Sequence, residues 1–410
     1  MKKILAMILA LAMIACLFAG CGEKTSDDGG EKKDVKVGVV LVGDENEGYT
    51  LAHINGIKEA CKNLGLSDTD NVVWKYAIPE DETCKTAIED CIDQGCTLVF
   101  TNSYGHQDYA KTAAEQNPNV DIVSMTGDTA KKSGLSNFHN AFTKIYEARY
   151  AAGVVAGMKI NQLKEEGKLT DKNMKDGKVK VGYVGAYAYA EVISGYTAFF
   201  LGIQSVCPDV TMDVLYTSSW FDITAEKAAA EQLIGDGCVI IGQHADSTGA
   251  PSACEAALNA VYSVGYNIDM LTAAPNAALV SPTNEWGVYY TYAIGAHMKG
   301  EKIETNWAEG FSEDAVALTK LGPNVAPGTQ EKVDEVVAQL KEGKLHVFDT
   351  STFTVKGEKV TSAFATDSDG DWVNDTDEAI IDGYYHESYF QSAPSFILRI
   401  DGITELNASN

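Results

Sequence analysis

From residue 35 onward, short apolar runs alternate with longer segments in which apolar residues recur every three or four positions. The short runs are rich in Val and Ile, as expected for strands covered on both faces of a parallel sheet. The longer segments have the spacing of helices that pack one face on such a sheet. The predicted strands are 35–42, 72–76, 97–101, 121–125, 179–184, 212–216, 239–242 and 261–266. The predicted helices are 51–64, 81–94, 108–117, 144–161, 192–206, 224–234 and 250–260.

A strand and a helix recur about every 25 to 30 residues, which predicts an α/β chain with two doubly wound parallel sheets. Ligands of such sheets bind beyond the carboxyl ends of the strands, so two sheets that face each other form a cleft there. Aromatic and amide residues are frequent in the segments that follow the strands: 43–49, 101–106, 185–189, 218–222, 242–247 and 265–269. Singly, each loop aromatic is interpreted as an ordinary rim contact. Together they favour a planar, hydrogen-bonding ligand held by stacking.

The first 20 residues have the pattern of a bacterial lipoprotein signal peptide. Lys2 and Lys3 precede an uncharged apolar run at 4–18, which is too short to span a bilayer as a mature helix. The run leads into Leu-Phe-Ala-Gly-Cys, which resembles a lipobox in which Cys21 becomes the first mature residue and carries lipid such as palmitate. The alternative is an ordinary secretory signal followed by an incidental cysteine. Residues 21–34 hold no large apolar side chain and predict a flexible tether.

The composition is that of a globular protein, with 45% hydrophobic and 22% charged residues. A net charge of −26 opposes binding to nucleic acid or to anionic lipid. Of nine cysteines, Cys16 is removed with the signal and Cys21 is lipidated on this interpretation. The other seven cannot all pair and lie in apolar or helical segments, so we expect buried thiols rather than a disulfide framework.

Common catalytic and nucleotide-binding motifs are missing from the sequence. It holds no Gly-x-x-x-x-Gly-Lys-Ser/Thr loop, no Gly-x-Gly-x-x-Gly after the first strand and no His-Glu-x-x-His. Ser103 and Ser247 lack the preceding glycine of a nucleophile elbow. His106 and His244 are interpreted as hydrogen-bonding residues of the cleft. We therefore predict a binding protein rather than an enzyme. The alternative is a cell-surface hydrolase or lyase that acts on a nucleoside-like substrate.

Six stretches, in this order, resemble the basic membrane protein family of substrate-binding lipoproteins of ABC transporters: 48–56, 145–158, 198–202, 219–222, 243–248 and 265–270. The resemblance covers about residues 35–350 and implies a type I periplasmic-binding-protein-like fold. Characterised members of the family bind purine nucleosides or nucleobases. The resemblance therefore implies an extracytoplasmic receptor for a purine-like solute, lipid-anchored to the outer face of the cell membrane, with an ABC permease and its ATPase as partners. A signalling receptor of the same fold is a further alternative.

The predicted domain boundaries follow from this fold. The first α/β domain is predicted at 35–137 plus 281–310, and the second at 138–280 plus 311–350. Residues 351–410 are predicted to form a C-terminal extension.

The resemblance also implies how the ligand is held. Tyr49 and Trp220 stand where the family places two aromatic residues that sandwich the base, one from each domain. Stacking of a base on an aromatic ring is worth ~1–3 kcal/mol. Gln243 and His244 would face the ligand from the second domain.

Sugar recognition is where this sequence departs from the nucleoside binders. They hold the ribose diol with an aspartate and a lysine, and Asn267 and Asn284 stand at these places, with Asp269 nearby. The loss of both charges favours a free nucleobase. The complete predicted ligand-binding set is Tyr49, Thr50, Tyr104, Trp220, Gln243, His244, Asn267, Asp269 and Asn284.

An acidic segment near the end of the sequence has the spacing of a calcium-binding loop. Residues 367–378 place oxygen ligands at loop positions 1, 3, 5, 9 and 12, although Trp372 replaces the usual glycine at position 6. We expect either a structural Ca²⁺ site or a solvated acidic loop, and no other cofactor. The candidate ligands are Asp367, Asp369, Asp371, Val373 through its backbone carbonyl, Asp375 and Glu378.

Overall fold

The computed structural model describes residues 35–257, 260–365 and 376–408, and the chain from Lys36 onward forms one compact unit. The predicted signal peptide, the tether with Cys21, and the predicted calcium ligands from Asp367 to Asp375 lie outside the described residues. In the part of the chain that is described, no helix has the length and apolarity needed to cross a membrane.

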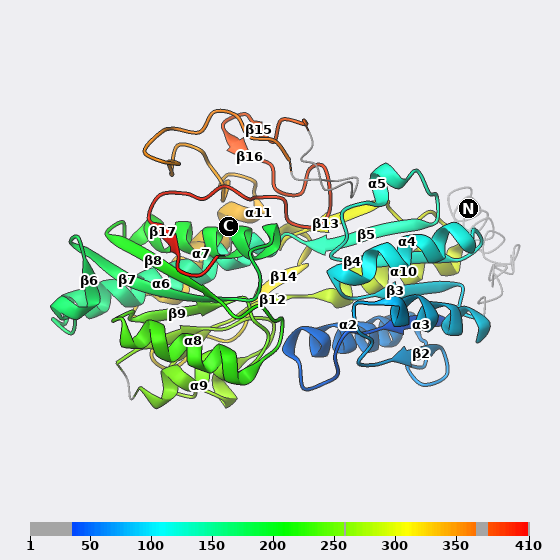
Figure 1. Cartoon of the computed structure of the whole chain (residues 1–410), viewed down its shortest axis with the longest axis horizontal. Coiled ribbons are helices and arrows are strands. Elements are labelled where there is room, and N and C mark those ends of the chain that lie inside the picture. Colours follow the sequence, from blue (N-terminus) through cyan, green and yellow to red (C-terminus); the bar gives the residue numbers. More distant parts are fainter. Residues whose placement is uncertain (1–34, 258–259, 366–375, 409–410) are drawn as a thin grey trace, which may run out of the picture. The chain divides into compact units, whose positions relative to one another are not determined.

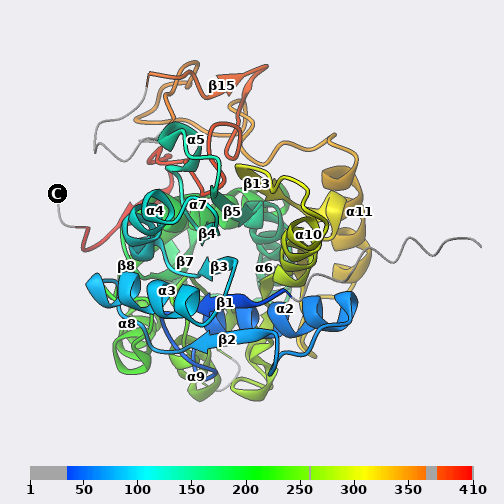
Figure 2. The same ribbon diagram turned by 90° about the vertical axis from the view of Figure 1, so that its right-hand side faces the viewer.

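The first large sheet consists of six parallel strands in the order β13-β5-β4-β3-β1-β2 (Figure 1). Its strands are β1 (Val37–Val40), β2 (Val72–Lys75), β3 (Leu98–Thr101), β4 (Asp121–Met125), β5 (Phe138–Thr143) and β13 (Asn306–Glu309). Figure 2 shows helices on both faces of this sheet, with α3 (Glu82–Asp93) and α4 (Gln107–Gln116) opposite α2 (Gly48–Leu64) and α10 (Trp286–Lys299). Every residue of β1, β3 and β5 is buried, as expected for a sheet covered on both sides.

The second large sheet has parallel strands in the order β11-β10-β9-β7-β8-β17, and a short β6 pairs antiparallel with β7. Its strands are β6 (Met174–Lys175), β7 (Lys178–Gly185), β8 (Val210–Tyr216), β9 (Ile240–Gln243), β10 (Tyr262–Val264), β11 (Ala278–Val280) and β17 (Ile403–Glu405). In Figure 1, α6 (Ile145–Glu165) and α7 (Ala190–Val206) cover one face, and α8 (Ile223–Gly235) and α9 (Gly249–Ala256) cover the other. The predicted α/β fold class with two doubly wound parallel sheets is confirmed.

Local sequence sets the starts of two of these helices. The Asp81 carboxylate accepts a hydrogen bond from the Thr83 N–H at 2.8 Å and caps α3. Asp222 caps α8 in the same way, with the N–H groups of Thr224 and Ala225 at 3.0 and 2.9 Å. Such caps satisfy N–H groups that have no partner within the helix.

Glycine permits the close crossing of α6 and α7 on the second sheet. A Cβ atom on Gly153 would lie 2.1 Å from the Phe199 carbonyl oxygen, and one on Gly202 would lie 2.0 Å from that of Tyr150. No larger residue fits at either position unless the two helices separate. Residues 145–158 and 198–202, two of the stretches that resemble the basic membrane protein family, thus meet at this crossing.

The seven cysteines of the globular part are all free and buried, which confirms the prediction of buried thiols. Cys84, Cys91 and Cys96 pack with Ile88 and Val99 in one core cluster beside the first sheet. Burial raises the pKa of the Cys84 thiol to about 12. These thiols act as small apolar side chains.

The chain passes between the two sheets through short connections. It first leaves the first sheet after β5, and α6 begins two residues later at Ile145. It returns from β11 through β12 (Pro282–Asn284) and leaves again from β13 through β14 (Val316–Leu318). β12 and β14 pair antiparallel with each other, and α11 (Thr329–Lys341) then packs on α6.

The segment that follows α11 contacts elements of both sheets. The Ser392 hydroxyl and the Ala393 N–H donate hydrogen bonds to the carbonyl of Gly127, which follows β4, at 3.1 and 3.3 Å. Farther along, β17 joins the edge of the second sheet beside β8, where the Tyr196 hydroxyl donates a hydrogen bond to Glu405 at 2.9 Å. Between α11 and β17 lies a small hairpin of β15 (Ile380–Ile381) and β16 (Tyr384–Tyr385).

Two strands belong to sheets other than those expected from the predicted domain boundaries. β5 lies beyond the predicted end of the first domain at residue 137, yet it pairs with β4 and β13 of the first sheet. β17 belongs to the predicted C-terminal extension, yet it completes the second sheet. The division into domains otherwise stays a prediction.

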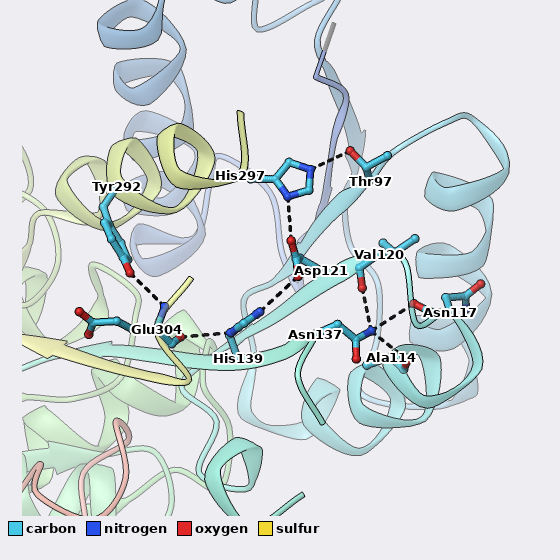
Figure 3. Close-up of polar contacts among 10 residues, drawn as sticks. All are labelled: Thr97, Ala114, Asn117, Val120, Asp121, Asn137, His139, Tyr292, His297 and Glu304. Atoms are coloured by element: carbon cyan, nitrogen blue, oxygen red, sulfur yellow. Dashed lines mark hydrogen bonds and ion pairs between the residues drawn. The ribbon is translucent and has the colours of Figure 1, made fainter. Parts of the chain in front are cut away.

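The polar residues of β5 interrupt the apolar pattern, and their partners are inside the fold (Figure 3). The ring of His139 in β5 lies 3.4 Å from a carboxylate oxygen of Asp121 in β4 and 3.1 Å from the carbonyl of Glu304. Asp121 also hydrogen-bonds His297 of α10 at 2.8 Å. Burial alone would raise the pKa of Asp121, but the hydrogen bonds with the two histidines lower it. A polar residue can therefore occupy a buried strand when its partners are built into the neighbouring elements.

Glu378 is the one predicted calcium ligand within the described residues. Its carboxylate accepts hydrogen bonds from the backbone N–H groups of Ala363 and Ile380, both at 2.9 Å, and from the Ser362 hydroxyl. Among the residues that the structure describes, no three His, Cys, Asp or Glu side chains are grouped so that they could hold a metal ion. The calcium loop therefore stays a prediction.

Candidate functional site

A small pocket lies where the loops that follow the strands of both sheets come together. Its cavity measures about 20 Å³, roughly enough for one water molecule. The backbone N–H of Gly48 at the start of α2 donates a hydrogen bond at 3.3 Å to the carbonyl of Asp246, which follows β9, so the two sheets touch here. The pocket is lined by Val42, Glu47, Tyr49, Asn102, Ser103, Tyr104, Thr126, Glu191, Trp220, Asp246 and Tyr266.

Three of the predicted ligand-binding residues line this pocket with aromatic rings. Tyr49 is buried in the first turn of α2, and its hydroxyl donates a hydrogen bond to the Asn102 carbonyl at 2.7 Å. Trp220 is half-buried in the loop after β8 and packs edge-on against Tyr187 at 5.1 Å between ring centroids. Tyr104 comes from the loop after β3. The structure thus brings Tyr49 and Trp220, which belong to different sheets, to one pocket.

Three carboxyl groups line the same pocket, and the sequence analysis did not select them. Burial raises the pKa of Glu47, although a hydrogen bond from Thr50 opposes the shift. Burial raises the pKa of Glu191 to about 7, against the lowering effect of nearby Arg149. Burial, then repulsion from neighbouring carboxylates, raises the pKa of Asp246 well above its usual range. All three lie in or next to the loops that follow strands, which is the signal that could have identified them.

A buried arginine lies behind the pocket. Arg149 of α6 is 2% exposed, and its Nη1 donates hydrogen bonds to the Tyr183 hydroxyl at 2.6 Å and to the Gln243 carbonyl at 2.9 Å. Its guanidinium carbon lies 3.8 Å from the ring centroid of Tyr266, a cation–π contact. This positive charge offsets part of the repulsion among the pocket carboxyls.

Three predicted residues have structural partners instead of lining the pocket. Thr50 is buried and hydrogen-bonds Glu47, so it orients a pocket carboxyl. Gln243 donates hydrogen bonds to the carbonyls of Ala245 and Ser247 at 2.7 and 3.0 Å, and it shapes the loop after β9. His244 is buried 3.1 Å from the Glu191 carboxyl. Burial, and then Arg149, lower the pKa of His244 well below its usual range, which keeps the ring neutral.

The three residues near the predicted sugar position line a different cavity, which measures about 260 Å³. Asn284 donates a hydrogen bond to Asn267 at 2.9 Å, and Asn267 donates one to Asp246 at the same distance. Asn284 also accepts one from the Thr143 hydroxyl. Asp269 is exposed and accepts a hydrogen bond from the Leu271 N–H at 2.8 Å. The two asparagines therefore join β5, β12 and the loops after β9 and β10.

A wider cavity of about 530 Å³ adjoins the small pocket and shares Val42, Glu47 and Trp220 with it. Because the inner pocket is much smaller than a planar heterocycle, a ligand of that size requires movement of the first turn of α2, which holds Tyr49, or of the loop that holds Trp220. Tyr187 lines this wider cavity, and Tyr189 stacks on Tyr187 with 5.1 Å between ring centroids. Trp220 contacts both rings.

The profile of the family described as ABC transporter substrate-binding protein PnrA-like matches residues 34–347. The chain belongs to this family. It is therefore an extracytoplasmic substrate-binding protein of an ABC transporter, and the resemblance to the basic membrane proteins is confirmed.

Several characterised or named relatives align over most of this PnrA-like chain. A purine-binding protein of Brucella abortus is 30% identical over 77% of this chain and 84% of its own length. A putative ABC transporter glucose-binding protein of Haloferax volcanii is 27% identical over 80% and 78%. An ABC transporter nucleoside-binding protein of Lactococcus lactis is 26% identical over 63% and 69%.

Solved structures support the fold alone, because their sequence identities are low. A solute-binding protein of an ABC transporter system from Aeropyrum pernix has a TM-score of 0.62 at 16% identity, over 77% of this chain and 93% of that one. A corresponding protein from Conexibacter woesei has a TM-score of 0.59 at 19% identity, over 76% and 98%. The type I periplasmic-binding-protein-like arrangement of two parallel sheets is thus shared with known solute-binding proteins.

The raised pKa of Glu191 predicts a specific pH dependence of stability. A carboxyl whose pKa is 4.5 in the unfolded chain and about 7 in the folded one stabilises the fold below pH 4.5, and this contribution is lost as the pH rises through 7. Between pH 5 and pH 8, the free energy of unfolding of Glu191→Gln should therefore gain ~2–3 kcal/mol relative to the parent protein. Urea denaturation at both pH values measures this change.

Glu115→Gln is the matched control, because Glu115 is exposed on α4. This variant should follow the parent protein at both pH values. An equal response of Glu191→Gln and Glu115→Gln would show that Glu191 does not titrate as an isolated, buried acid.

Proposed function

We propose that this protein is the lipid-anchored receptor of an ABC importer for a purine nucleobase. The observation that carries this proposal is the pocket lined by Tyr49, by Trp220 and by the carboxyl groups of Glu47, Glu191 and Asp246. Aromatic side chains suit the flat face of a purine. Carboxyl groups suit its edge, since an ionised carboxylate accepts N–H donors and a protonated one also donates. The name of the Brucella relative supports the same ligand class.

A free base is favoured over a nucleoside because the predicted ribose position is already engaged. Asn267 and Asn284 hydrogen-bond each other and are each 4% exposed. Both amides would have to break these hydrogen bonds to hold a ribose diol. Breaking a buried hydrogen bond between neutral groups costs about 1 kcal/mol or more.

Anchoring through Cys21 is the second part of the proposal. A lipid on Cys21 and a polar tether at 22–34 would keep the binding domains near the permease, which raises their local concentration at the transporter. The strongly acidic body would gain little from a membrane surface by itself.

Loss of the Trp220 ring should weaken binding without unfolding the protein. In isothermal titration calorimetry with adenine, Trp220→Ala should bind at least tenfold more weakly than the parent, a loss of about 1.4 kcal/mol. Trp220→Phe should restore most of the affinity, because it keeps a stacking face. Thermal melting of the free protein should change little, since Trp220 is only half-buried. Adenine should also quench the fluorescence of Trp220.

Trp74→Phe, in the edge strand β2, is the control for this experiment. Trp74 is half-buried and does not line the pocket. The Trp74→Phe variant should therefore bind adenine as tightly as the parent protein, and adenine should still quench its tryptophan fluorescence. Unchanged adenine affinity in Trp220→Ala would show that the Trp220 ring does not contact the ligand, and it would contradict the proposed stacking arrangement.

Ligand class is tested by comparing bases with their nucleosides. Adenine, guanine and hypoxanthine should raise the melting temperature more than adenosine, guanosine and inosine, because ligand that binds only the folded state stabilises it by mass action. Differential scanning fluorimetry at equal ligand concentrations measures this order. A larger shift with nucleosides would refute the argument from Asn267 and Asn284, and a shift with only sugars or amino acids would refute the purine assignment.

Lipidation is tested at the cysteine itself. In a bacterial host, the parent protein should fractionate with membranes and yield an N-terminal peptide that carries lipid on Cys21. Cys21→Ala should lose the lipid and leave the membrane fraction or remain unprocessed. Cys16→Ala, within the predicted signal peptide, should behave like the parent. An unmodified Cys21 in the parent protein would contradict the anchor.

A further inference from the structure

Another cavity, away from the three described above, lies between the first turn of α6 and the segment that follows α11. It measures about 260 Å³ and contains none of the predicted ligand-binding residues. Lys144, Tyr146 and Glu147 line one side, directly after β5. The other side comes from residues 343–348 and 384–389, which lie mostly beyond the stretch matched by the family profile.

Aromatic rings make up much of the wall of this cavity. The rings of His346 and Tyr384 stack at 3.7 Å with planes 5° apart, and Tyr384 and His386 stack at 3.9 Å. Tyr146 packs against Phe348 at 5.4 Å. Because the rings hold one another, the wall is formed before any ligand binds, which lowers the entropy cost of binding.

Two carboxyl groups and one ammonium group line the cavity. Glu147 and Glu387 both line it. The Phe311 N–H donates a hydrogen bond to Glu147 at 2.8 Å, and the Phe396 N–H donates one to Glu387 at 2.7 Å. Glu387 is 2% exposed, whereas Glu147 is half-buried. Lys144 supplies a positive charge, but its ammonium group lies 3.6 Å from Glu309 and is shared with that carboxylate. Lys144 therefore offers little free positive charge to an anionic ligand.

We propose that this cavity is a binding site for a small organic cation of the alkylated ammonium class. Aromatic rings attract such a cation through their π electrons, and the ionised carboxyl of Glu147 supplies the opposite charge. An alkylated ammonium suits a wall that is both aromatic and acidic. Its alkyl groups pack on the rings, and its positive charge needs no hydrogen-bond acceptor.

Both carboxyls hold a proton more tightly in the free protein than they would in water. Burial raises the pKa of Glu147, and it raises the pKa of Glu387 to about 8. The pKa of a carboxyl rises when it is removed from water without a cation nearby, and a bound cation lowers the pKa again.

Choline chloride is the probe for the test, and 3,3-dimethyl-1-butanol is its uncharged analogue of the same shape. In calorimetry with the full chain, choline should bind at least tenfold more tightly than the alcohol. Saturation of the cleft with adenine should leave choline binding unchanged, which separates this site from the proposed purine pocket. Equal binding of choline and the alcohol, or competition between choline and adenine, would overturn the proposal.

Tyr389→Ala and Glu147→Gln locate the site. Tyr389 lines the cavity but is 63% exposed, so its removal does not open the core, and choline affinity should fall about fivefold. Glu147→Gln should lower choline affinity about tenfold and affect the alcohol little. Tyr76→Ala, at a tyrosine that is 42% exposed elsewhere, is the matched control and should bind choline as the parent does. Failure of choline to bind the folded parent protein, or full affinity in both cavity variants, would refute the site.

Discussion

The buried guanidinium of Arg149 is the contact on which the arrangement of the cleft depends. It reaches from α6 to the Tyr183 hydroxyl in β7, to the backbone at the end of β9 and to the ring of Tyr266 after β10. A Cβ atom on Gly195 would lie 3.0 Å from its Nε, so α7 approaches closely only because that residue is glycine. A charge with so little access to water is costly unless hydrogen bonds and opposite charges surround it. Several elements of the second sheet are thus fixed around one side chain.

The same arginine controls the chemistry of the pocket in front of it. Its charge lowers the pKa of Glu191 while burial raises it, and the result is a carboxyl that changes protonation near neutral pH. Burial, and then the charge of Arg149, lower the pKa of His244 and keep its ring neutral. The pocket can therefore adjust its balance of hydrogen-bond donors and acceptors to a ligand. A fixed charge on Glu191 would lack that freedom.

Most elements were predictable because the apolar pattern of a doubly wound sheet is continuous and its helices are periodic. β1, β4 and α7 lie within a few residues of their predicted ranges. β5 was missed as a member of the first sheet because it carries polar residues whose partners lie far away in sequence. For the candidate site, stretches with strong resemblance pointed to Tyr49 and Trp220, and both line the pocket. The roles of Gln243 and Asn267 depend on three-dimensional partners, and resemblance at single positions does not contain that information.

The pairing of β8 with β17 has a consequence for how the protein is made. The two strands lie 191 residues apart in sequence, as shown by the matching contact between Tyr216 and Asn407. Since domains begin to fold during synthesis from the N-terminal side, β8 remains an open sheet edge until the later residues emerge. An unpaired, mostly apolar edge is a template for pairing with another chain. Fast translation of the segment between them, or a chaperone that covers β8, would therefore favour recovery of the native protein over aggregation.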